Sequence, residues 1–90
     1  MQKIDERQKE KIFEITNKMA SDIERIKKEI DDTQNILKQL CDEENLQTYY
    51  TWTIDERLNE AKIRLDMAKT RISEFEDEAK CMQLSTSGFY

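Results

Sequence analysis

The side chains that could perform chemistry in this chain are two cysteines, a cluster of aromatic residues and several runs of carboxylates. The sequence contains no histidine, so it lacks the commonest general base and the commonest transition-metal ligand. Carboxylates stand side by side at 31–32, 43–44 and 76–78. Adjacent residues of a helix point about 100° apart, so these groups do not converge on one substrate. We expect a solvated charged surface, no enzymatic activity and no bound metal or cofactor.

The cysteines, Cys41 and Cys81, form none of the paired motifs that bind metals or carry out redox reactions. The simplest interpretation is an intracellular, cytoplasmic protein with reduced thiols. The first residues lack the apolar core of a signal peptide. No stretch of about 18 apolar residues occurs, so the sequence predicts no membrane span.

The aromatic cluster, Tyr49, Tyr50 and Trp52, is the most unusual feature of the sequence. Tyrosine and tryptophan dominate binding hot spots, but they can equally close the end of a helical core. The three residues before 45 are acidic, and residues 29–60 carry nine Asp/Glu against two Lys/Arg. Together with a net charge of -5, this acidity argues against nucleic acid as a partner and favours a basic protein surface.

Two apolar stripes define the elements that must position these residues. In each stripe the apolar residues recur at steps of three and four, which places them on one face of a helix. With 39% charged residues, one glycine and no proline, the composition is typical of coiled helices. The steps from Ile15 to Met19 to Ile23 interrupt the heptad with a stutter. The first stripe comprises Ile12, Ile15, Met19, Ile23, Ile26, Ile30, Thr33, Leu37 and Leu40, and the second comprises Ile54, Leu58, Ala61, Leu65, Ala68, Ile72, Phe75, Ala79 and Met82.

The chain therefore reads as one helical domain, 1–90, with helices over about 3–41 and about 54–84. The apolar seam lapses between the stripes, which predicts a connector over about 42–53, and residues 85–90 form a tail. Thr53 and Glu56 have the spacing of a capping box and predict the start of the second helix.

The fold class is all-α, and two architectures fit it. In an antiparallel hairpin the two stripes, which are equal in length, pack against each other, with Ile26 opposite Ala68 and Leu40 opposite Ile54. Large residues then meet small ones, as packed layers prefer. Alternatively, one long helix forms a parallel coiled-coil dimer, because the two stripes share one heptad phase and no proline interrupts them.

Apolar residues remain outside both stripes, and two helices cannot cover all of them. Phe13 and Ile36 lie beside the first stripe, and Ile63 and Met67 lie beside the second. Such residues predict a protein partner that binds by helix packing in a homo- or hetero-oligomer. The leading function is a non-enzymatic structural subunit or adaptor that contributes helices to a multi-chain helical assembly. The alternative is a small regulatory inhibitor or chaperone-like module that binds its target through the aromatic and acidic tip.

Overall fold

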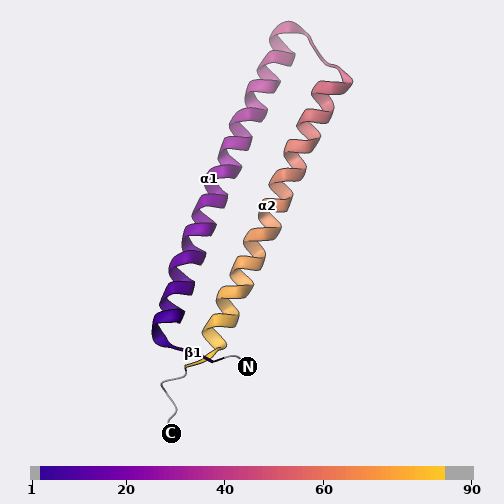
Figure 1. Ribbon diagram of the computed structural model, residues 1–90. Coiled ribbons are helices and arrows are strands. Elements are labelled where there is room, and N and C mark those ends of the chain that lie inside the picture. The colour runs from indigo at the N-terminus through magenta and orange to yellow at the C-terminus, as the bar shows by residue number, and fades with distance from the viewer. Residues whose placement is uncertain (1–2, 85–90) are drawn as a thin grey trace.

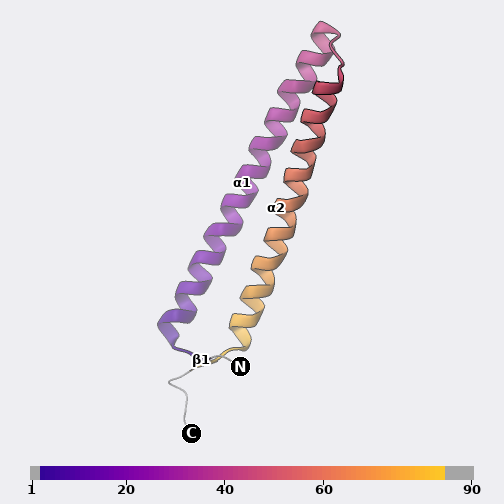
Figure 2. The same cartoon turned by 45° about the vertical axis from the view of Figure 1, so that its right-hand side comes forward.

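The protein is an antiparallel helical hairpin in a computed structural model that describes residues 3–84. Helix α1 (Glu6–Glu44) and helix α2 (Tyr49–Cys81) run side by side along their whole length (Figures 1 and 2). With 39 residues, α1 is about 58 Å long at 1.5 Å per residue. The hairpin prediction is confirmed, and the single long helix is excluded because the chain reverses at 45–48.

Helix α1 is defined at both ends by polar residues. The carboxylate of Asp5 accepts from the amide of Gln8 at 2.7 Å, and the Gln8 side chain accepts from the amide of Asp5 at 3.0 Å. These two bonds satisfy amides that the first helical turn leaves free. At the other end Asn45 adopts the left-handed conformation, with φ 51°, and its amide donates to the carbonyl of Cys41. Asparagine tolerates this conformation better than most residues, so the helix ends there.

Helix α2 begins earlier than the sequence predicts. Thr48 is its N-cap, and Thr48 and Thr51 each accept from the other's amide, at 3.2 and 2.9 Å. The predicted capping box of Thr53 and Glu56 is wrong, because the Thr53 hydroxyl donates to the carbonyl of Tyr50 within the helix. The connector is therefore 45–48 rather than about 42–53, and α1 continues to Glu44. The predicted tail, 85–90, lies outside the described residues.

The seam between the helices is half apolar and half polar. On each helix one row of the predicted stripe faces the other helix, namely Ile23, Ile30 and Leu37 on α1 and Leu58, Leu65, Ile72 and Ala79 on α2. The second row of the seam consists of Lys27, Gln34 and Cys41 on α1 and Asp55, Lys62, Lys69 and Glu76 on α2, all partly buried. On each helix one row keeps its predicted place and the other is shifted by one residue, which corresponds to a rotation of the helix by about 50°.

This rotation corrects the sequence prediction for the other row of each stripe. Ile26 and Ala68, expected to meet between the helices, are both exposed. The predicted stutter is not used either, because Thr16 is only 1% exposed whereas Ile15 is 43% exposed. The Thr16 hydroxyl donates to the carbonyl of Phe13, which satisfies its buried oxygen. The seam therefore keeps one heptad register from Thr16 to Cys41.

The end of the hairpin opposite the connector is closed by a short parallel pairing that the sequence did not reveal. Strand β1 (Lys3–Ile4) pairs with strand β2 (Gln83–Leu84), and both lie at the foot of the helices (Figure 1). Ile4 and Met82 are buried there beside Ala79, which is completely inaccessible to solvent. This small cluster holds the two chain segments together.

The corrected helix start can be tested with two threonine substitutions. Thr48→Ala removes the cap of α2, so we expect it to lower the free energy of unfolding by about 1 kcal/mol. Thr53→Ala is the matched control, because alanine suits a helix interior and the change should stay within about 0.5 kcal/mol. Urea unfolding followed by circular dichroism measures both. The reverse order of effects would place the helix start at Thr53.

Candidate functional site

One broad side of the hairpin is an open apolar face. It is formed by the stripe row that the rotation leaves outside the seam. Six of its large side chains are between 38% and 48% exposed, so neither helix covers them. We name it the open apolar face, and it comprises Ile12, Ile15, Met19, Ile26 and Leu40 of α1 with Ile54, Ala61, Ala68 and Phe75 of α2.

The two helices contribute to the same side because the opposite side is occupied by ion pairs. Lys62 reaches Asp31 at 2.7 Å, Lys69 reaches Glu24 at 2.8 Å, and Lys27 pairs with Asp66. In both helices the ion-paired residues stand one or four positions after a residue of the apolar seam row. Most residues of the open apolar face stand four positions before one. The exposed apolar rows of α1 and α2 therefore lie together on the side away from the ion pairs.

The ion pairs shift the pKa values of two of the groups that form them. The hydrogen bond from Lys69 lowers the pKa of Glu24, and the one to Asp66 raises the pKa of Lys27. All of these groups reach solvent, so they stabilise the hairpin modestly. The lysine stems are covered by the seam while their ammonium groups bind carboxylates outside it. This side is thus already satisfied by contacts within the chain.

The open apolar face deepens into a hollow near the β1–β2 end. The hollow has a volume of about 360 Å³ and lies between the two helices. Ile12 and Ile15 line it from α1, Phe75 lines it from α2, and Ile4 and Met82 form its end. Its lining is mostly apolar, and Gln8 and Lys11 are its polar members. Such a hollow suits an apolar side chain of a protein partner.

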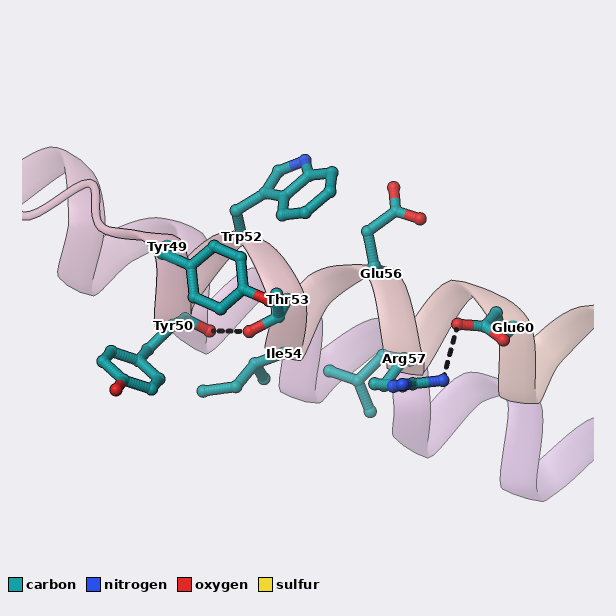
Figure 3. Close-up of a pocket in the computed structure, with 9 residues that line it drawn as sticks. Tyr49, Tyr50, Trp52, Thr53, Ile54, Glu56, Arg57 and Glu60 are labelled. Carbon is teal, nitrogen blue, oxygen red and sulfur yellow. Dashed lines mark hydrogen bonds and ion pairs between the residues drawn. The ribbon is translucent and has the colours of Figure 1, made fainter.

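The aromatic tip is formed by Tyr49, Tyr50 and Trp52 on the first turn of α2. Their side chains are 70%, 74% and 59% exposed, so they do not close the hairpin core. Tyr49 packs edge-on against Tyr50, with ring centroids 5.8 Å apart, and its ring lies 6.2 Å from that of Trp52. The rings border an open hollow of about 690 Å³ on the side of α2 that faces away from α1 (Figure 3).

The tip residues point to different sides of α2. Figure 3 shows Trp52 and Glu56 on one edge of the helix, and Tyr50 and Ile54 on the other. Trp52 also borders a hollow of about 440 Å³ between the helices, opposite Lys38 and Asp42. Ile54 belongs to the open apolar face, so Tyr50 lies at the edge of that face. The aromatic tip and the open apolar face are therefore continuous.

The four predicted flanking residues do not form one surface. Phe13 is half-buried towards α2, in line with the polar row of the seam. Ile36 is exposed beside the open apolar face, between Thr33 and Leu40. Ile63 and Met67 are 60% and 61% exposed on the side of α2 that faces away from that face. The structure thus brings Ile36 to the main apolar surface and separates Ile63 and Met67 from it.

Sequence reasoning missed the open apolar face because it assigned all stripe residues to the seam. A usable signal was the row Lys62, Lys69 and Glu76, which repeats at heptad spacing beside Leu65 and Ile72. Within residues 3–84, no helix has the length and apolarity that crossing a bilayer requires. In the same range, no three His, Cys, Asp or Glu side chains are grouped to hold a metal ion. Cys41 and Cys81 carry free thiols at opposite ends of the hairpin.

The ion pairs predict a pH dependence of stability. The pKa of Glu24 is lower in the folded chain than in the unfolded chain, so its contribution is present at neutral pH and is lost as the pH falls through the folded value. We expect the melting temperature to decrease as the pH falls below 4.5, the ordinary pKa of a glutamate side chain. Glu24→Gln should reduce this decrease. Glu56→Gln, at an exposed position without an ion pair in the described range, should leave it unchanged.

No protein-family model matches this chain, and no curated protein or solved structure is significantly similar to it. The surfaces described above are therefore the basis for inferring function.

Proposed function

We propose that this chain is a non-enzymatic structural subunit that contributes two helices to a multi-chain helical assembly. The open apolar face is the surface through which it assembles. The observation that carries the proposal is the rotation of each helix by about 50°, which turns half of each apolar stripe away from the hairpin seam. We place this assembly inside the cell, because Cys41 and Cys81 lie at opposite ends of the hairpin and no disulfide within the chain can stabilise it.

The rotation matches the geometry of a larger bundle. In a two-helix coiled coil both rows of an apolar stripe face one partner helix. In a bundle of four helices each stripe faces the centre, between two neighbouring helices. Here Ile23 and Ile30 face α2 while Ile26 faces the open side, so the stripe of α1 points between two directions. Further helices over the open apolar face would bury the second row.

The energetics agree with this arrangement. The hairpin buries few residues completely, and its largest fully buried side chain is the polar Thr16. Burial of apolar surface stabilises by about 25 cal/mol per Å², so covering Met19, Ile26 and Phe75 would add several kcal/mol. A contiguous exposed apolar surface of this kind is typical of an interface.

A second candidate function rests on the aromatic tip. Tyr49, Tyr50 and Trp52 are exposed, mutually packed and directly preceded in the fold by the acidic end of α1. Rigid aromatic anchors with a charged surround are characteristic of binding hot spots. In this role the tip of the subunit would engage a basic protein target, as a regulatory or chaperone-like module does.

Site-specific photocrosslinking tests the leading proposal. A photoreactive phenylalanine analogue at residue 26 lies on the open apolar face, and the same group at residue 63 lies on the outer side of α2. In the native cell we expect residue 26 to form adducts with a protein chain and residue 63 to form few or none. Mass spectrometry of the adducts identifies the covering chain. Equal adduct yields at the two positions would contradict assembly through this face.

The aromatic tip has its own test in Trp52→Ala. The ring is largely exposed, so the melting temperature should change little, as for other surface substitutions. If the tip is a hot spot, affinity for a target found by crosslinking at residue 49 should fall by about 2 kcal/mol or more. Met67→Ala removes another exposed apolar side chain from α2 and serves as the control. Equal affinities for Trp52→Ala and Met67→Ala would exclude a tip-specific function.

A further inference from the structure

We propose that the chain covering the open apolar face is a second copy of this protein, turned by 180° about the long axis of the hairpin. The result is a four-helix bundle in which α1 of one copy packs on α2 of the other, with both connectors at the same end. This inference rests on the proposed function and adds the identity and orientation of the partner.

The charges along the two edges of the open apolar face carry the argument. On α1, Asp22 and Glu29 each stand three residues after a face residue, Met19 and Ile26 respectively. This spacing places both carboxylates along the outer edge of the face. We call them the acidic edge.

On α2 the corresponding edge is basic. Arg57, Arg64 and Arg71 stand three residues after Ile54, Ala61 and Ala68, and all three arginines are exposed. Arg71 pairs with Glu74 and Arg57 with Glu60, whereas Arg64 makes no ion pair within the described residues. We call these three residues the arginine edge. The row of α1 along the open apolar face thus carries two carboxylates, and the corresponding row of α2 carries three arginines.

The two edges are also in register along the hairpin. Glu24 pairs with Lys69 and Asp31 with Lys62 across the seam, which fixes residues that lie at the same height. Asp22 lies two residues before Glu24, and Arg71 lies two residues after Lys69. Because the helices are antiparallel, both steps lead towards the same end, so Asp22 and Arg71 lie at one height. The same reasoning places Glu29 level with Arg64.

Within one copy these charges lie on opposite edges of the face. Asp22 instead pairs with Lys18 and Arg25, and Glu29 pairs with Arg25, all within α1. A second copy stacked face to face and turned about the long axis brings its α2 over the first copy's α1. Asp22 then meets Arg71 of the second copy, and Glu29 meets Arg64 of the second copy. The twofold symmetry repeats both contacts, so the acidic edges face the arginine edges on both sides of the bundle.

The other face-to-face twofold arrangement is disfavoured by the same charges. A turn about an axis across the hairpin would place α1 on α1 and α2 on α2. The acidic edges would then face each other, and so would the arginine edges, which costs affinity at every contact. Charge complementarity therefore selects the arrangement in which both connectors lie at one end.

The apolar residues fit the selected arrangement. A turn about the long axis keeps every residue at its height along the hairpin. Ile26 of one copy is therefore level with Ala68 of the other, and Leu40 is level with Ile54 of the other. Layers of large and small side chains can interdigitate in this way. Arg57 lies level with Ile36, whose exposed side chain the aliphatic stem of the arginine can cover. Two helices, each about 10 Å wide, over about 50 Å offer about 1,000 Å² per copy, which exceeds the roughly 800 Å² of a standard interface.

Complementary charge reversals test the orientation. The variant R64E/R71E makes both edges acidic, and D22R/E29R makes both edges basic. We expect the unsubstituted chain to sediment as a dimer, and each variant alone to dimerise at least about tenfold more weakly, because like charges now meet at four contacts. An equimolar mixture of the two variants should regain the dimer mass, since every contact in the mixed dimer joins opposite charges.

A matched control alters the same number of charges elsewhere. R7E/K28E places its changes three heptads apart in one row, away from the open apolar face, and both positions are exposed. This variant should dimerise like the unsubstituted chain. Circular dichroism checks that each variant stays helical, and the mixture serves as an internal test of folding. Dimerisation of either variant at the original strength, or no recovery in the mixture, would overturn the proposed orientation.

The second test measures the distance between the connectors of the two copies in a chain whose acidic edge and arginine edge are unchanged. A spin label at residue 47, in a C41S/C81S background, marks the connector, which is exposed. With both connectors at one end, the two labels of a dimer should lie within about 30 Å, whereas the other arrangement separates them by about the helix length of 50 Å or more. A monomer at all concentrations, combined with crosslinking of residue 26 to a different protein, would refute the second copy and leave the proposed function intact.

Discussion

The ion pairs across the seam determine how each helix is rotated about its own axis. Lys27, Lys62 and Lys69 occupy seam positions that apolar residues fill in an ordinary two-helix coiled coil. Their stems cover the neighbouring apolar row, and their ammonium groups bind carboxylates of the opposite helix. If the helices turned to bury the whole apolar stripe, these pairs would be broken. The open apolar face therefore exists because the opposite side of the hairpin is held by charge.

Such pairs add little to stability one by one, because all of them reach solvent. Their main effect is on specificity. In the observed register all three lysines meet an acid of the opposite helix, whereas a shift of seven residues in either direction would leave only one of them opposite an acid. The apolar row alone, with Ile23, Ile30 and Leu37 spaced by whole heptads, would tolerate a shift of seven residues. The charged row removes that freedom.

The sequence predicted all-α structure with two apolar stripes of equal length, and the antiparallel hairpin was one of the two architectures that this pattern allowed. It did not predict the rotation, since a seam between two helices and the centre of a bundle have the same heptad period. It also misplaced the start of α2, because Thr48 with Thr51 and Thr53 with Glu56 both resemble caps and only packing distinguishes them. The aromatic cluster was recognisable by composition. Its exposure could not be predicted, because the same side chains could equally have closed the end of the helical core.

The open apolar face also affects the abundance of this protein in the cell. A copy without its partner displays Met19, Ile26 and Phe75 on a surface that chaperones and proteases are suited to recognise. A second copy over the open apolar face would hide those side chains and protect the chain from degradation. With a second copy as the partner, the protected amount would rise more steeply than the rate of synthesis, because pairing depends on the concentration of both copies. The side chains that join the two copies would in this way also mark for removal the copies that stay unpaired at low concentration.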